Sequence, residues 1–184
     1  MNLQDMKNMP PEKQKELFKK LSGVRKKAKV VSYSAVYGVG KAKLSRTTGM
    51  PEEEAAKLLE AFWDINWAVK RVAETATIRK IGGQMWLYNP VSRFWISLRY
   101  EKDAFSSLNQ STGVFCFDSW LAQMWRYGVK GVFQAHDEVL VLTGDKETTE
   151  QVMRTAISNV NDTLKLNVPL GIDVQFGLRY SEVH

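Results

Sequence analysis

Four side chains spaced four residues apart could together hold an anionic, planar ligand: Arg25, Lys29, Tyr33 and Tyr37. On an α-helix that turns about 100° per residue they form one slowly drifting stripe, two cations followed by two aromatic rings. Arginine and lysine can bind a triphosphate, and aromatic rings can stack on a base or a sugar. The stripe therefore indicates a nucleotide-binding helix, although a basic amphipathic helix with a solvated face has the same pattern.

A second group of polar residues is Gln134-Ala135-His136-Asp137-Glu138, which has an apolar arm on each side. This pattern predicts a β-hairpin over 131–142 with His136-Asp137 at its tip. Adjacent carboxylates are costly to hold together unless a cation neutralises them, and hard oxygen ligands suit Mg²⁺. Asp137 and Glu138 are thus candidate metal-binding residues, and the alternative is an exposed turn.

A third group, Gln110-Ser111-Thr112-Gly113, places polar side chains at the opening of an otherwise apolar helix. Amide side chains suit hydrogen bonding to nucleic-acid edges and sugars. Helix capping explains the same residues equally well.

The stripe can form only if its four residues lie on one long amphipathic helix. Pro10-Pro11 favours a helix start and Gly38 a helix stop, so we expect a helix over 11–38. Apolar residues recur at steps of three and four on the opposite side and predict a buried back: Leu17, Leu21, Val24, Ala28, Val31 and Ala35.

The other groups also need elements to position them. The patterning predicts, in chain order, a short link over 41–50, a helix over 51–77, a β-hairpin over 86–98, a helix over 104–127, a helix over 148–165 and a last strand around 172–176.

Charge and composition narrow the class of protein. The 184 residues have 44% hydrophobic and 25% charged content, which is ordinary for a globular protein of one domain or two small ones. Residues 1–46 hold 12 Lys/Arg against 3 Asp/Glu (+9), and the other 138 hold 14 against 17 (−3). This local basic excess favours phosphate partners. A single cysteine excludes an internal disulfide, and no run of about 18 apolar residues occurs.

Together and in this order, the three groups resemble the motifs of family A DNA polymerases, the group that includes bacterial DNA polymerase I and many phage polymerases. Residues 25–38 are similar to the fingers-helix motif, motif B, and residues 134–138 to motif C at the palm hairpin. Residues 110–113 resemble the intervening helix motif, and the end of the chain resembles the family's terminal glycine, aromatic residue and final histidine, here His184.

The resemblance implies an α+β fold, with a helical fingers subdomain and part of an antiparallel palm sheet packed with helices. Residues 1–85 would be fingers, with the nucleotide-binding helix at 11–38. Residues 86–184 would be palm, with the metal-binding hairpin at 131–142.

The resemblance also implies roles for individual residues. Arg25 and Lys29 would bind the phosphates of the incoming deoxynucleotide, with Lys29 as general acid. Tyr33 would pack on the sugar, and Tyr37 and Gly38 would stand at the templating base.

In the same resemblance, Gln110 and Gln134 would contact the minor groove of primer–template DNA and His136 the primer end. Asp137 would ligate catalytic Mg²⁺, and Glu138 would assist nearby.

The two-metal mechanism needs carboxylates that hold a pair of ions about 3.5–4 Å apart. In the family another Asp comes from motif A, upstream of the fingers helix. Only 24 residues precede Arg25 here, and their Asp5 lies in a polar stretch without a strand pattern. The expectation is therefore one chain of a split polymerase. A second polypeptide would carry motif A and the thumb, with or without an exonuclease.

Three alternatives stay open at this point. The chain could be a non-catalytic DNA-binding accessory, an inactive truncated remnant, or a fragment of a single-subunit RNA polymerase. The Asp137-Glu138 pair and Gln110 argue against the RNA polymerase. For a DNA polymerase subunit, the expected location is the cytoplasm of a bacterium or of a phage-infected host.

Overall fold

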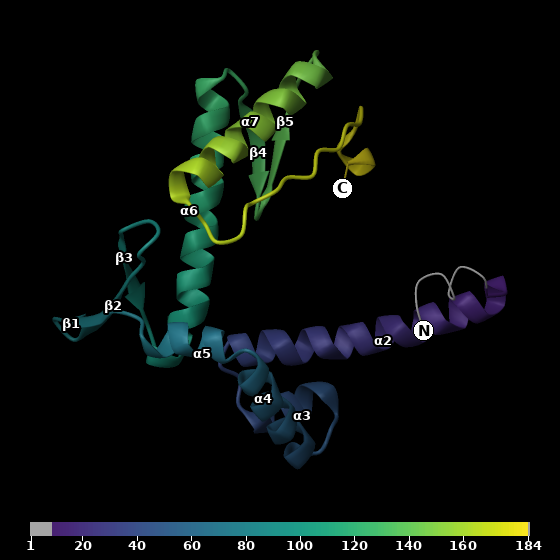
Figure 1. Cartoon of the computed structure of the whole chain (residues 1–184), viewed down its shortest axis with the longest axis vertical. Coiled ribbons are helices and arrows are strands. Elements are labelled where there is room, and N and C mark those ends of the chain that lie inside the picture. The colour runs from purple at the N-terminus through teal and green to yellow at the C-terminus, as the bar shows by residue number, and fades with distance from the viewer. Residues whose placement is uncertain (1–8, 184) are drawn as a thin grey trace. The chain divides into compact units, whose positions relative to one another are not determined.

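The computed structural model describes residues 9 to 183 (Figure 1), so Asp5 and His184, named above, lie outside the described residues. Within the described part, no helix is long and apolar enough to cross a membrane. The helices are α2 (Pro11–Val36), α3 (Lys41–Thr48), α4 (Glu52–Ile65), α5 (Trp67–Glu74), α6 (Ala104–Arg126) and α7 (Lys146–Leu164), with 3₁₀ turns η1 (Glu101–Asp103) and η2 (Tyr180–Glu182). The strands are β1 (Ile78–Ile81), β2 (Gln84–Tyr88), β3 (Trp95–Leu98), β4 (Gly131–Ala135) and β5 (Glu138–Val141).

These elements form two compact units, and their helices and antiparallel sheets confirm the expected α+β class. The first unit contains the described residues up to Tyr88 together with Trp95–Leu108, and the second contains Asn89–Phe94 and the chain from Asn109 onward. A division at 85/86 therefore does not follow the compact units, because residues 86–88 and 95–98 pair in the same sheet as β1. The assignment of the units to fingers and palm stays a prediction.

The helix expected over 11–38 is observed as α2, which runs from Pro11 to Val36 without a break at Gly23, but its apolar back is largely exposed. Ala35 is buried, whereas Leu21 is 46% and Val24 59% exposed. Helices α3 and α4 pack against α2. Among the described residues nothing covers the apolar side chains in its N-terminal half, so the prediction of a buried back is wrong there.

The region after α2 is more finely divided than the sequence suggests. The expected link over 41–50 contains helix α3, whose only buried residue is Leu44, so it has too little apolar periodicity to be recognised. The expected helix over 51–77 is two helices, α4 and α5, separated at Asn66. The Asn66 side chain donates to the carbonyl oxygen of Phe62 (2.8 Å), the kind of local bond by which asparagine competes with the helix backbone.

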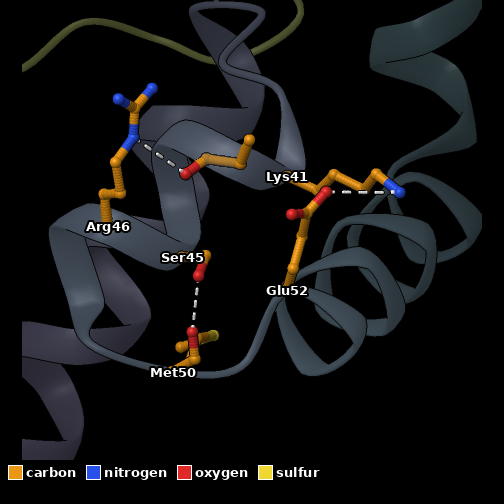
Figure 2. A network of polar contacts seen from close by, with 6 residues as sticks. Lys41, Ser45, Arg46, Met50 and Glu52 are labelled. Atoms are coloured by element: carbon orange, nitrogen blue, oxygen red, sulfur yellow. Dashed lines mark hydrogen bonds and ion pairs between the residues drawn. The ribbon is translucent and has the colours of Figure 1, made fainter.

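Polar contacts fix the connection between α3 and α4 (Figure 2). The Ser45 hydroxyl donates to the carbonyl oxygen of Met50 at 2.7 Å, and Lys41 Nζ lies 3.4 Å from Glu52 Oε1. The ion pair is exposed and contributes little to stability. The hydroxyl bond is partly buried and closes the turn.

The hairpin predicted over 86–98 is confirmed as β2 and β3, and a further strand, β1, extends it to a three-stranded antiparallel sheet. Gly82 and Gly83 both have positive φ (56° and 79°), as a two-residue type I′ turn requires. One side of this sheet packs on a small core around Leu87, Leu98 and Ala104. Strand β1 was missed because it has only four residues, two of them charged.

The second unit is built on α6 and α7. Their core is Trp120, Met124, Met153, Ala156 and Val160, and the Trp120 indole N–H donates to the carbonyl oxygen of Met153 at 3.0 Å. Partly buried side chains of the β4–β5 hairpin, among them Val139 and Val141, pack on this core. The hairpin is therefore anchored on its apolar side.

The last strand predicted around 172–176 is wrong, because this segment pairs with no strand among the described residues. The alternation that suggested it is real: Ile172 and Val174 pack on the α6–α7 core. The segment is held instead by Asn161, whose side chain donates to the carbonyl oxygen of Leu170 (2.9 Å) and accepts from its N–H (2.8 Å).

One fully buried polar side chain joins the turn after β2 to α6. Asn89 Nδ2 donates to the hydroxyls of Ser111 (2.8 Å) and Thr112 (3.0 Å). Its Oδ1 accepts from the backbone N–H groups of Val91 (2.9 Å) and Ser92 (3.2 Å). Every hydrogen-bonding atom of the side chain has a partner, as burial demands.

We therefore expect Asn89→Ala to lower the free energy of unfolding by about 2 kcal/mol, because it leaves buried donors and acceptors without partners. Urea unfolding followed by circular dichroism measures this. Asn159→Ala is the control, since it removes one exposed bond, to the Tyr127 hydroxyl, and should cost under about 1 kcal/mol. Equal losses in the two variants would contradict the structural role of Asn89.

Candidate nucleotide-binding and metal-binding sites

The predicted nucleotide-binding residues lie on one face of α2 and its C-cap. Arg25 and Lys29 are exposed, Tyr33 is 53% exposed, and the C-cap residue Tyr37 is 44% exposed. Lys29 Nζ lies 5.4 Å from the centre of the Tyr33 ring, within cation–π range. A continuous helix thus presents two cations and two rings at one-turn intervals, a geometry that can contact phosphates at one end and a planar group at the other.

Gly38 ends this helix by a Schellman motif. The N–H of Gly38 donates to the carbonyl oxygen of Ala35 (3.0 Å), and the N–H of Val39 donates to that of Ser34 (2.8 Å). Gly38 takes φ +64°, the left-handed conformation that glycine adopts without a Cβ penalty. The glycine therefore has a backbone reason to be here, in addition to any contact with a base.

The predicted hairpin over 131–142 is confirmed, with His136-Asp137 as its two-residue turn between Ala135 and Glu138. His136 and Asp137 are exposed and Glu138 is half-buried. His136 has φ +53°, uncommon for a residue other than glycine. Such strained positions often mark functional sites.

The base of the hairpin fixes the position of its tip. A Cβ at Gly131 would lie 2.5 Å from Val139 Cγ2, so only glycine fits against β5 there. The register shifts between Gly131 and Phe133, as at a β-bulge.

The tip carries carboxylates of the kind that bind metal ions. The exposed carboxylate of Asp137 and the half-buried carboxylate of Glu138 are hard oxygen donors of the kind that Mg²⁺ prefers. Among residues 9–183, however, no three His, Cys, Asp or Glu side chains gather as a complete cluster of ligands. These donors fit Mg²⁺ in kind, and a metal site at this tip would need further ligands.

The amide residues occupy different settings. Gln110 is exposed in the second turn of α6, which begins at Ala104, and it makes contacts within the chain. The capping interpretation of residues 110–113 is wrong, because the helix starts six residues earlier and Ser111 and Thr112 bind Asn89. Gln134 is exposed on β4, opposite Val139.

The stripe on α2 belongs to the first unit, and Gln110, Gln134 and the hairpin tip belong to the second. Within the second unit, the turn places His136, Asp137 and Glu138 consecutively.

Sequence reasoning missed two features. The first is the buried bridge that the Asn89 side chain makes from a loop to α6. The second is a stack of Arg79 on Trp95, whose guanidinium carbon lies 4.7 Å from the ring centre. The alternation of aromatic residues along β2 and β3 was its available signal.

Comparison with known proteins gives relatives of one kind. No family model matches the chain. DNA polymerase theta of Caenorhabditis elegans is 25% identical over 191 residues, which cover 92% of this chain and 12% of that protein. The thermostable DNA polymerase I of Thermus aquaticus is 26% identical over 168 residues, covering 84% of this chain and 20% of that protein. The chain resembles part of a family A DNA polymerase.

A solved structure shows the same fold. It is the POL domain of Pol1 from M. smegmatis, in complex with DNA primer-template and dNTP, with a TM-score of 0.58 and 17% identity over 75% of this chain and 28% of that chain. The family A resemblance inferred from the motifs is thus confirmed, and the chain spans about an eighth to a quarter of the lengths of these relatives.

Two glycines, one at the end of α2 and one inside it, lead to opposite predictions for the free energy of unfolding. Gly38→Ala should lower the free energy of unfolding by about 1–2 kcal/mol, because an L-residue is strained in the left-handed region. Gly23 lies inside α2 with nothing within 4 Å of its Cβ direction, so Gly23→Ala should raise helix stability by up to about 1 kcal/mol. Thermal unfolding followed at 222 nm measures both. Stabilisation by Gly38→Ala would contradict the motif.

Proposed function

We propose that this chain is the C-terminal subunit of a DNA-directed DNA polymerase that adds deoxynucleotides to a primer 3′ end. The observation that carries the proposal is the exposed face of α2. Arg25, Lys29, Tyr33 and Tyr37 stand in line on one helix that ends at Gly38, in a chain whose relatives are DNA polymerases.

The face of α2 would bind the incoming nucleotide. Arg25 and Lys29 bind its phosphates through charge-assisted hydrogen bonds, which are stronger than neutral ones. Lys29 also carries a proton that it can give to the leaving pyrophosphate as general acid. Tyr33 packs on the sugar, and Tyr37 and Gly38 lie at the templating base.

The β4–β5 hairpin would bring the metal ligand and the primer end together. Asp137 holds Mg²⁺ and Glu138 assists beside it, while His136 contacts the primer terminus. Bound Mg²⁺ supplies charge neutralisation and orientation of the reacting oxygens. Gln110 and Gln134 hydrogen-bond the minor groove of the primer–template and fix its register.

The described residues supply only part of the set of metal ligands, so the site needs another carboxylate. We propose that it comes from outside these 184 residues, on a second polypeptide that also carries the thumb. In this arrangement activity requires both chains, since the two-metal mechanism depends on carboxylates from each.

The experiment is primer extension by the reconstituted complex, in which Asp137→Asn should lower the rate by roughly a hundredfold or more, because the site would lose a carboxylate that would hold Mg²⁺. Asp118→Asn is the matched control, since Asp118 is an exposed carboxylate on α6 and not on the β4–β5 hairpin. It should stay within about twofold of the unaltered complex.

Two results would count against the proposal. If Asp137→Asn extends primers at the normal rate while DNA is still bound, the chain is a non-catalytic DNA-binding accessory. If ribonucleotides are incorporated in preference to deoxynucleotides, the activity is that of an RNA polymerase.

A further inference from the structure

The outer face of the three-stranded sheet takes no part in the proposed nucleotide or metal site. The opposite face packs on the core through Ile78, Met85, Leu87, Ile96 and Leu98. Strand alternation places a different set on the outer face: Arg79, Ile81, Gln84, Trp86, Tyr88, Trp95 and Ser97. This outer set is rich in aromatic rings, and Ile81 is its only aliphatic member.

Three of these side chains form a stack. The rings of Tyr88 and Trp95 lie 5.2 Å apart with a 49° tilt, and the Arg79 guanidinium carbon lies 4.7 Å from the Trp95 ring centre. Arg79 is exposed, and Trp95 is 36% exposed. Trp86 is directly opposite Arg79 in the register of β1 and β2. The stack thus ends in a planar cation that is open to solvent.

The charged side chains on the three strands are all positive. The three strands contain Arg79 and Lys80 and no acidic residue. Lys80 points to the other face, where its Nζ lies 3.3 Å from Glu101 Oε1. Among the described residues Arg79 forms no ion pair, so its N–H groups are available to an anion while its guanidinium carbon lies over the Trp95 ring.

We propose that this outer face binds single-stranded nucleic acid, with bases stacking on the Tyr88–Trp95–Arg79 ladder and a backbone phosphate contacting Arg79. Aromatic side chains and arginine planes are the surfaces on which unpaired bases stack. The strands carry positive charge and no acidic residue, which favours a polyanionic ligand over an uncharged protein surface. The inference does not depend on the polymerase function, because it concerns binding and not nucleotidyl transfer.

The test measures the dissociation constant of the full chain for fluorescein-labelled oligo(dT) and oligo(U) of twelve nucleotides, by anisotropy. Base stacking is worth about 1–3 kcal/mol, so Trp95→Ala should weaken binding roughly fivefold or more. Trp67→Ala is the matched control, because Trp67 is an exposed tryptophan (62%) on α5. It should leave the constant within about twofold.

A second pair of variants guards against misfolding of Trp95→Ala. Arg79→Gln and Lys80→Gln each remove one positive charge from β1, on opposite faces of the sheet. Arg79→Gln should weaken binding several-fold, and Lys80→Gln should not. If the variants weaken binding of oligo(dT) alone, the ligand is DNA. If they weaken binding of both oligonucleotides equally, the face stacks bases of DNA and RNA alike.

Binding of blunt duplex DNA is measured to distinguish base stacking on this face from general electrostatic attraction to basic residues. The lysines of α2 also contribute to that attraction. Affinity for the duplex should be the same in Trp95→Ala and the unaltered chain. The proposal is overturned if Trp95→Ala and Arg79→Gln leave single-strand binding within twofold, or if they weaken duplex binding to the same extent.

Discussion

The proposed chemistry depends on one constraint, the unbroken hydrogen-bonded backbone of α2 and its stop at Gly38. A helix rises 1.5 Å per residue, so side chains four residues apart are held about 6 Å apart along its axis. In the proposed site, this spacing would let two cations bind a triphosphate while the rings one and two turns later contact its nucleoside. The Schellman motif ends the helix immediately after Tyr37, and the stripe therefore finishes at the end of the helix.

The second unit holds polar residues at the end of a short hairpin. A two-stranded hairpin is marginal in water by itself. Here Val139 and Val141 pack on the α6–α7 core, and Gly131 allows β4 and β5 to approach closely at the base. The tip is thereby supported from below, and His136 can keep its uncommon backbone conformation.

Much of this could be predicted from the sequence, where a local pattern decides the outcome. Helix α2, the two hairpins and α7 follow from periodicity and turn residues. What failed depended on tertiary context. The seam of α2 has the right period, but no described element covers Leu21 and Val24. The alternation at Ile172 and Val174 reflects packing on helices rather than pairing in a sheet. Asn89 binds Ser111 and Thr112, which lie 22 and 23 positions further along the chain. The sequence around Asn89 therefore does not indicate the bridge.

The central claim is that the exposed face of α2 holds the incoming nucleotide, and photolabelling tests it most directly. The chain with primer–template DNA is irradiated with an azido-substituted deoxyadenosine triphosphate and digested with trypsin. Cleavage after Lys29 and Lys41 isolates residues 30–41, which contain Tyr33 and Tyr37. The account predicts that the label lies on this peptide and disappears with excess unlabelled deoxynucleotide. Label on other peptides, or label on this one that resists competition, would contradict it.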